Sequence, residues 1–238
     1  MKNSSFSALI YREYLICKKN LHTALISIPI FSVMPLLIAL SLRLGNLTML
    51  PESIVADIRA HSDLLMKMYA VIVPCMLCIS VAEAAAYDSK LNWDYFRRTT
   101  PVSPARMALA KYVFYAMLIV VSFLLAVIAL TLFTLTMDTP IRKTDIALIL
   151  LFITCFCAMS VVAQLYIMLL RSVDKGMLAM LATLAAPIML LMKEDSRFTA
   201  ESFLTFGAQI LPLFPVLLFM ILAFGFSVTT LLYKRRVK

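Results

Sequence analysis

Long apolar runs constrain this chain more than any other feature of its sequence. Of its 238 residues, 63% are hydrophobic and only 15% are charged, and the mean hydropathy is +0.95. A soluble core of this size cannot hide so much apolar surface, so the expected solvent is a bilayer. A helix of about 20 apolar residues crosses the roughly 30 Å hydrocarbon layer. Six segments reach or approach that length, at roughly residues 21–42, 64–86, 112–137, 145–170, 176–192 and 206–233.

These runs predict an all-α integral membrane protein with six transmembrane helices. They do not alternate between apolar and polar residues, as the strands of a transmembrane barrel would. When loops are assigned alternately from a cytoplasmic N-terminus, 15 of the 22 Lys and Arg but only five of the 13 acids fall inside. Because short cytoplasmic loops are enriched in Lys and Arg, both termini are predicted to be cytoplasmic.

The positive charge, formally +9, sits in short loops and does not form a folded basic face. Nucleic acid is therefore not an expected partner, whereas anionic membrane lipid is. Residues 1–20 are too polar for a secretory signal and predict an amphipathic N-terminal elbow helix ahead of the six-helix domain of residues 21–238. One face of this helix is expected to carry Phe6, Leu9, Ile10, Tyr14 and Cys17, with Arg12, Lys18 and Lys19 reaching lipid headgroups.

Motifs for catalysis or cofactor binding are absent from the sequence. It has no GxxxxGK[ST] phosphate loop, no HExxH zinc helix and no GxSxG elbow, and it contains only four glycines. Cys75 and Cys78 are spaced as a CxxC pair, but they lack further ligands nearby and are expected to be apolar membrane residues. The chain is thus predicted to be no enzyme and to bind no metal, cofactor or nucleotide of its own.

Few polar groups interrupt the predicted spans. Lys67 and Glu83 lie near the two ends of the second span, where snorkelling satisfies them, and Gln164 lies well inside the fourth. Gln164 has two possible roles, an interhelical hydrogen bond or a contact with a transported substrate. A proton-coupled carrier would need more buried ionisable groups than these.

One dense polar segment, residues 87–111, separates the second span from the third. Asp88 or Ser89 is expected to cap a short helix in "DSKLNWDYFRR", which Pro101 and Pro104 would end. Trp93 and its aromatic and basic neighbours suit either an interfacial belt or a protein-docking knob, and composition leaves both open.

The run "YDSKLNWDYFRRTTPVSPARMALAKY" resembles the segment between helices two and three in permease subunits of bacterial ATP-binding-cassette transporters, type-2 exporter class. Within that class it is most similar to the branch of phenol-soluble modulin and related antimicrobial peptide exporters. The matching positions are Tyr87, Asp88, Lys90, Trp93, Pro101, Val102, Ser103, Lys111 and Tyr112. "YREYLICKKNL" also resembles the N-terminal elbow of this class. Asn92, Thr100 and the Pro104–Ala105 pair depart from the branch pattern.

The resemblance implies that residues 87–111 hold a cytoplasmic coupling helix docked on a separate ATPase, present in two copies and carrying ATP and Mg. By match, the docking residues are Asp88, Lys90, Trp93, Tyr95, Phe96, Arg97, Arg98 and Pro101. It also implies a second permease in a dimer, a bacterial cell membrane, and ATP-driven export of an amphipathic or hydrophobic peptide. The alternatives are a membrane-embedded immunity or sensor protein without transport and, ranked last, a proton-coupled carrier.

Overall fold

The protein is all-helical in every part that its computed structural model describes, namely residues 2–43, 67–68, 70–90, 102–137, 140–181 and 207–235. The main helices are α1 (Lys2–Arg43), α3 (Ser80–Lys90), α5 (Pro104–Met137), α6 (Lys143–Leu170) and α9 (Leu213–Arg235), and a short 3-10 helix, η1 (Met76–Ile79), precedes α3. The predicted all-α class is confirmed over these residues.

Four described helical stretches are long and apolar enough to cross a membrane. They are Ala70–Lys90, Pro104–Thr136, Lys143–Leu170 and Leu213–Arg235, and they match the predicted second, third, fourth and sixth spans. The predicted first span falls within α1, where Leu21–Ile30 is a shorter apolar stretch. Residues 182–192 of the predicted fifth span lie outside the described ranges. A multi-pass membrane protein is therefore supported, and the count of six stays a prediction.

Helix ends differ from the predicted boundaries on both sides of the polar segment. α3 continues to Lys90, and α5 begins at Pro104, ahead of the predicted start at residue 112. Proline suits the first turn of a helix because its missing N–H has no partner there, and the Ser103 carbonyl accepts the first amides, from Arg106 at 3.0 Å and Met107 at 3.2 Å. The predicted coupling segment of residues 87–111 thus has both its ends inside long helices.

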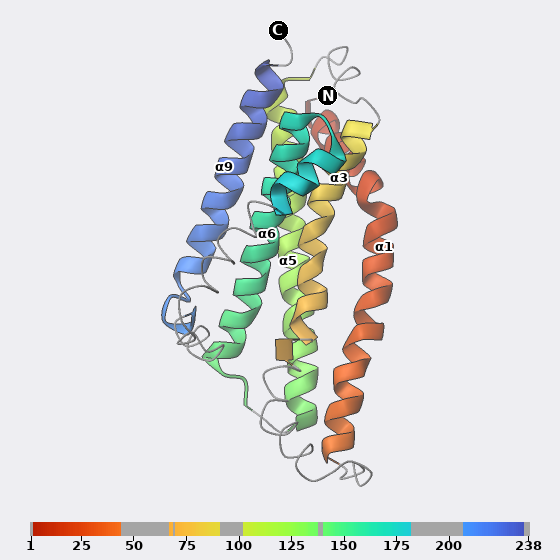
Figure 1. Ribbon diagram of the computed structural model, residues 1–238, viewed down its shortest axis with the longest axis vertical. Helices are drawn as coiled ribbons and strands as arrows, with labels where there is room; N and C mark the ends of the chain where they lie inside the picture. Colours follow the sequence, from red (N-terminus) through yellow and green to blue (C-terminus); the bar gives the residue numbers. More distant parts are fainter. Residues whose placement is uncertain are drawn as a thin grey trace.

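The predicted N-terminal elbow helix is continuous with the first predicted span, because α1 stays helical for 42 residues through the predicted boundary at residue 20. The elbow itself stays a prediction. Figure 1 shows α3, α5, α6, α9 and most of α1 running lengthwise in one bundle, with the first part of α1 turned aside behind α3 and both chain termini at the same end. We call this the terminal end, and it holds the start of α1 and α5 and the end of α3, α6 and α9; the opposite end is the distal end.

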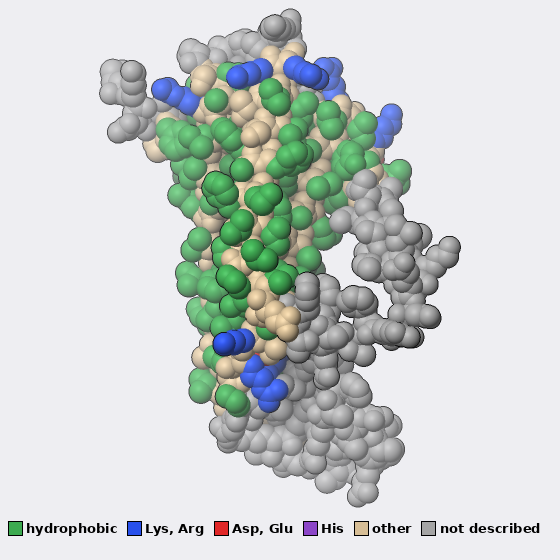
Figure 2. All heavy atoms as spheres, turned by 90° about the vertical axis from the view of Figure 1, so that its left-hand side faces the viewer, with side chains coloured by type: hydrophobic (Ala, Val, Ile, Leu, Met, Phe, Trp, Pro, Cys, Tyr) green, Lys and Arg blue, Asp and Glu red, His purple; other side chains and the backbone are tan. Residues whose placement is uncertain are grey.

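α5 is the central helix of the bundle and contacts α1, η1, α6 and α9. Its buried side chains include Tyr115, Leu130 and Phe133, each at most 2% exposed. α9 is the opposite case, with Phe219 72% and Phe224 63% exposed. Figure 2 shows hydrophobic side chains covering this face between Lys and Arg side chains at the two ends. That distribution is the one a lipid-exposed surface requires.

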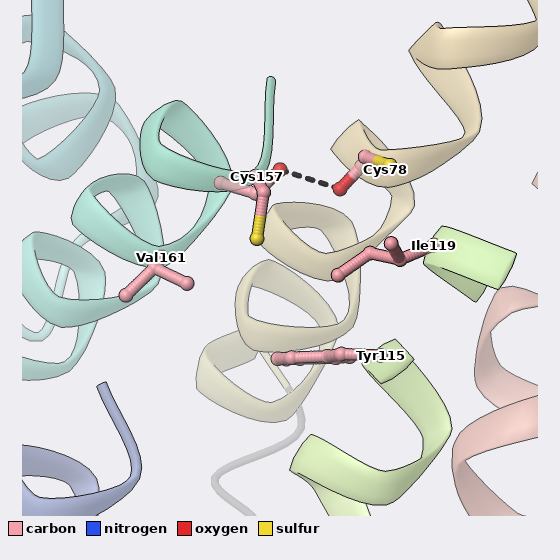
Figure 3. Close-up of a pocket in the computed structure, with 6 residues that line it drawn as sticks. Cys78, Tyr115, Ile119, Cys157 and Val161 are labelled. Carbon is pink, nitrogen blue, oxygen red and sulfur yellow. Dashed lines mark hydrogen bonds between the residues drawn. The ribbon is translucent and has the colours of Figure 1, made fainter. Parts of the chain in front are cut away.

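A proline breaks the helical stretch that ends in α3. Pro74 precedes η1, and two serines from neighbouring helices donate to carbonyls at this break: Ser122 Oγ to Pro74 at 2.6 Å and Ser160 Oγ to Cys78 at 2.7 Å. Because backbone groups freed inside a membrane need another partner, these serines make the break tolerable. Figure 3 shows a cavity beside it, lined by Cys78, Tyr115, Ile119, Cys157, Ser160 and Val161, with room for about one water molecule.

Candidate functional site

The predicted docking residues fall into two groups. Asp88 and Lys90 lie in the last turn of α3, where Lys90 is exposed. The other six, Trp93, Tyr95, Phe96, Arg97, Arg98 and Pro101, lie outside the described residues. Their contact with an ATPase therefore stays a prediction.

Asp88 differs from its predicted role. It lies inside α3 and does not begin a separate helix, and its side chain is only 14% exposed. One carboxylate oxygen accepts a hydrogen bond from Arg12 Nη2 of α1, and the other accepts one from Lys111 Nζ of α5 at 2.7 Å. Asp88 therefore joins three helices at the terminal end, and its predicted contact with an ATPase stays a prediction.

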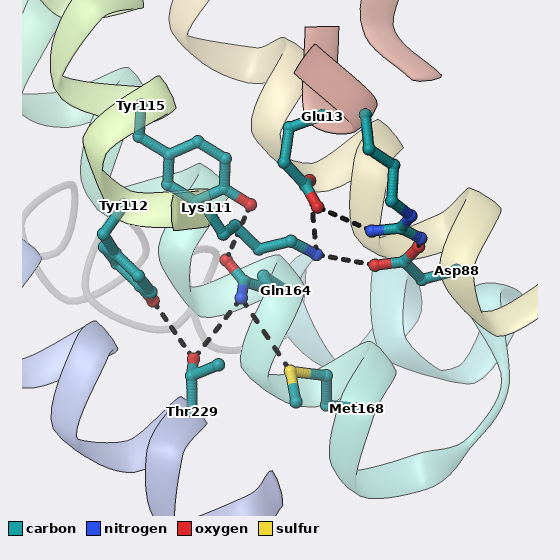
Figure 4. A network of polar contacts seen from close by, with 9 residues as sticks. Glu13, Asp88, Lys111, Tyr112, Tyr115, Gln164, Met168 and Thr229 are labelled. Atoms are coloured by element: carbon teal, nitrogen blue, oxygen red, sulfur yellow. Dashed lines mark hydrogen bonds and ion pairs between the residues drawn. The ribbon is translucent and has the colours of Figure 1, made fainter. Parts of the chain in front are cut away.

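Four ionisable side chains meet at this point, and we call Arg12, Glu13, Asp88 and Lys111 the charge cluster (Figure 4). Arg12 Nη1 lies 2.7 Å from Glu13 Oε1, and Lys111 Nζ lies 3.8 Å from Glu13 Oε2. Lys111 is 2% exposed and Glu13 4%. With two cations and two carboxylates, the charges balance, as burial in an apolar bundle demands.

The position of Glu13 corrects the predicted face of the N-terminal helix. Glu13, Cys17 and Leu21 follow one another at helical spacing and are buried, whereas Tyr14, predicted for that face, is 37% exposed. The expectation that Arg12 reaches lipid headgroups is also not met, because Arg12 binds Asp88 and Glu13. The sequence held a signal for this face. Glu13 lies four residues before Cys17 and so on the same side of the helix, and a carboxylate on an apolar face requires a partner.

Glu13 is the least satisfied member of the charge cluster. Its Oε2 has no hydrogen-bond partner in the described part of the chain. Burial raises the pKa of Glu13 above its ordinary value of 4.5; Lys111 opposes that rise, nearby Asp88 adds to it, and Arg12 also opposes it. Glu13 therefore binds its proton more readily in the folded protein than a solvated glutamate does.

A second polar group, the amide cluster, lies beside the charge cluster and consists of Tyr112, Tyr115, Gln164, Met168 and Thr229 (Figure 4). Tyr115 donates its hydroxyl to Gln164 Oε1 at 3.1 Å. Gln164 Nε2 donates to Thr229 Oγ1 at 3.4 Å and to Met168 Sδ at 3.8 Å, and the Tyr112 and Thr229 hydroxyls are 3.2 Å apart. Gln164 thus forms the interhelical hydrogen bonds predicted as one of its roles, while a contact with cargo stays a prediction.

α5 connects the two clusters. Lys111, Tyr112 and Tyr115 lie within five residues, so one stretch of α5 reaches α1 and α3 on one side and α6 and α9 on the other. Gly225 of α9 makes room for this stretch, because a Cβ there would collide with the Tyr112 hydroxyl and would lie 2.7 Å from Val161 Cγ1. One polar layer therefore links all five main helices near the terminal end.

The distal end holds a separate buried ion pair. Lys67 Nζ lies 3.2 Å from Asp145 Oδ1, and the two residues are 2% and 5% exposed. The prediction that Lys67 snorkels to the interface is therefore wrong. Asp145 also accepts the Arg142 backbone N–H at 2.9 Å and lies in the first turn of α6, where the helix N-terminus favours negative charge.

No site for a catalytic metal appears in the described residues. Nowhere in these ranges do three His, Cys, Asp or Glu side chains gather as a metal site. Cys75 and Cys78 are buried, and burial among apolar neighbours is the habit of structural cysteines. The cavity in Figure 3 has space only for a water-sized group.

The bundle, its lipid-type surface and its buried polar layer define a multi-pass helical membrane protein. Residues 8–233 match the family model described as "ABC-2 family transporter protein", and the chain belongs to this family. The match makes it a membrane permease component of an ATP-binding-cassette transporter and implies a partnering ATP-binding subunit. No curated protein and no solved structure matches the chain.

Proposed function

We propose that this chain is the permease subunit of an ATP-driven exporter that moves amphipathic or hydrophobic peptides out of a bacterial cell. A separate subunit binds ATP and Mg and hydrolyses the nucleotide. The observation that carries the proposal is the family match over residues 8–233, nearly the whole chain. The sequence is consistent with this division of labour because it contains no phosphate loop.

The helices that flank residues 91–101 support a coupling role for this segment. α3 ends and α5 begins at the terminal end, and the Asp88–Lys111 ion pair holds them together. The chain therefore leaves and re-enters the described bundle at one place. We assign Trp93, Tyr95, Phe96, Arg97, Arg98 and Pro101 to the contact with the ATPase on the family resemblance of this segment.

The charge distribution of the described helices supports a cytoplasmic terminal end. The exposed cations of the helices at that end are Lys18, Lys19, Lys90, Arg106, Arg171, Lys175, Lys234 and Arg235, whereas Arg142 and Lys143 are exposed at the distal end. This bias is the one that cytoplasmic loops show. ATP is cytoplasmic, so the coupling segment and the nucleotide would lie on the same side.

The bundle interior supports an apolar or amphipathic cargo. Between the polar layer and the distal ion pair, the buried side chains are mostly hydrophobic, as in the cluster of Val71, Cys75, Ala126, Leu130, Leu148 and Ile153. An ion path would need charged or carbonyl-lined sites along this length. A pair of permeases with two ATPases would open a route for cargo by rearrangement of their helices.

The test is to co-express the permease with its cognate ATPase and to reconstitute the complex in proteoliposomes. Trp93→Ala and Arg97→Glu are each expected to lower recovery of the ATPase and transport-linked ATP hydrolysis, because aromatic and Arg side chains dominate interface energies. Lys143→Glu, an exposed change at the distal end, is the control and is expected to leave recovery unchanged. Unchanged recovery and hydrolysis in the first two variants would contradict the docking assignment. Efflux that stops when the proton gradient collapses at constant ATP would contradict ATP-driven transport.

A further inference from the structure

The two ends of the coupling segment are held by one set of side chains. Asp88 lies three residues before position 91, and Lys111 lies ten residues after position 101. Their ion pair, 2.7 Å from Nζ to Oδ2, therefore closes the segment at its base. Arg12 and Glu13 add α1 to this closure from the side.

The energetics of burial suggest a role beyond holding the helices together. Placing charges in a low-dielectric interior carries a desolvation cost, and well-packed apolar side chains often hold helices as firmly without that cost. A buried ion pair instead fixes the relative position of the helices that it joins, because each carboxylate oxygen must meet one particular donor on the neighbouring helix. Here Asp88 uses one oxygen for Arg12 and the other for Lys111, so α1, α3 and α5 have a defined relative height.

The amide cluster fixes the position of α6 and α9 relative to α5 in the same way. Lys111 belongs to the charge cluster, and Tyr112 and Tyr115, on the same stretch of α5, bind Thr229 of α9 and Gln164 of α6. A displacement of the α5 start therefore reaches α6 and α9 through directed hydrogen bonds as well as through apolar packing. These hydrogen bonds add requirements of distance and angle between named atoms that apolar contacts do not have.

We infer that Arg12, Glu13, Asp88 and Lys111 are positioning residues that set the coupling segment relative to α1 and make α1, α3 and α5 move as one body. This inference rests on the proposed function, and it moves Asp88 from the ATPase contact to the support behind it. The ATPase then acts on a segment whose two ends are already joined. Motion of the segment is delivered to the bundle through the polar layer.

The test separates position from stability by removing charge in balanced pairs. Asp88→Asn with Lys111→Met removes one negative and one positive charge, so Arg12 and Glu13 remain as a neutral pair. The permease–ATPase complex is reconstituted in proteoliposomes and assayed for thermal midpoint, for ATPase recovery, and for molecules of a fluorescent amphipathic helical peptide moved across the membrane per ATP hydrolysed. The double variant is expected to keep a cooperative unfolding transition while transport per ATP falls at least tenfold.

Two further double variants complete the design. Arg12→Gln with Glu13→Gln removes the two α1 residues of the charge cluster and keeps the Asp88–Lys111 pair, so transport per ATP is expected to fall by a smaller factor. If the first double variant fails to fold, this second one tests the inference. Lys67→Met with Asp145→Asn removes a buried ion pair at the distal end and is expected to leave transport per ATP unchanged.

The outcomes distinguish this inference from the function on which it rests. If both terminal-end variants transport as much cargo per ATP as the unchanged protein, the cluster only stabilises the fold and the inference is wrong, while the proposed function stands. If the distal variant loses coupling to the same degree, the effect is not specific to the coupling segment and the inference is also wrong. If the unchanged permease recovers no ATPase, the inference and the proposed function fail together.

Discussion

The two ends of the bundle satisfy their buried charges in different ways. At the terminal end, Glu13 and Asp88 depend on the side chains of Arg12 and Lys111, which come from two helices. At the distal end, Asp145 has a side-chain partner in Lys67 and also a backbone donor at the start of its own helix. The distal carboxylate therefore keeps local support when its cation is removed, and Glu13 has Arg12 beside it in the chain, whereas Asp88 loses support that only the packed helices supply.

The largest effect is expected from Lys111→Met. This change leaves Glu13 and Asp88 with Arg12 as their only cation in the cluster, and breaking a buried ion pair costs about 3–5 kcal/mol of unfolding free energy. Reversible unfolding in mixed micelles measures the loss, and the double variant with Asp88→Asn should recover part of it. A loss below about 1 kcal/mol, typical of exposed pairs, would show that the cluster is solvated.

A packing change at the terminal end comes next. In Gly225→Ala the new methyl group meets the Tyr112 hydroxyl and Val161, and overpacking of this kind costs about 1–3 kcal/mol. Gly207→Ala is the matched control near the distal end of the bundle, because its nearest neighbour beyond the local backbone would be Ala147 Cβ at 3.8 Å. Equal unfolding free energies for the two variants would contradict the close approach of α5 to α9.

A smaller loss is expected from Lys67→Met than from Lys111→Met. Asp145 would keep the Arg142 N–H and the favourable α6 N-terminus, so the cost should stay near the 1–3 kcal/mol of a hydrogen bond to a charged group. The same micelle unfolding experiment measures both variants side by side. If Lys67→Met were the more damaging of the two, the contrast between the ends would be reversed.

The smallest effect concerns pH and Glu13. Because the folded protein raises the pKa of Glu13, this residue contributes stability that is fully present below its ordinary value of 4.5 and is lost as pH rises through the folded pKa. Glu13→Gln cannot titrate, so the melting temperature of the unchanged protein relative to this variant should fall as pH rises through that window. A relative melting temperature that rises with pH would mean that the ion pairs outweigh burial and that the pKa is lowered.

Several features of the fold were predictable because they depend on local chemistry. The apolar runs place four of the predicted spans in described membrane-length helices, since an amino-acid stretch of that length and hydropathy has few other structures available. The interhelical bonds of Gln164 also follow from its position, because an amide inside an apolar span must find a partner. Which partner it finds was not readable from its neighbours in the sequence.

The predictions that failed depended on distant contacts. Arg12 was expected at lipid headgroups and Lys67 at the interface, but Asp88 lies 76 positions from Arg12 and Asp145 lies 78 positions from Lys67. Each carboxylate offers a stronger interaction than water or lipid once the helices bring it close. No local pattern around either cation indicates that proximity.

The sequence by itself determined that the protein lies in a lipid bilayer, that it is helical, that Lys and Arg gather in the loops on one side, and that it has no phosphate loop. These features depend on composition and on residues close together in the chain. Only the tertiary structure decided that Asp88 pairs with Arg12 of α1 and Lys111 of α5. The physical reason is that a buried charge takes whichever opposite charge the packed helices bring within reach, and that choice exists only after packing.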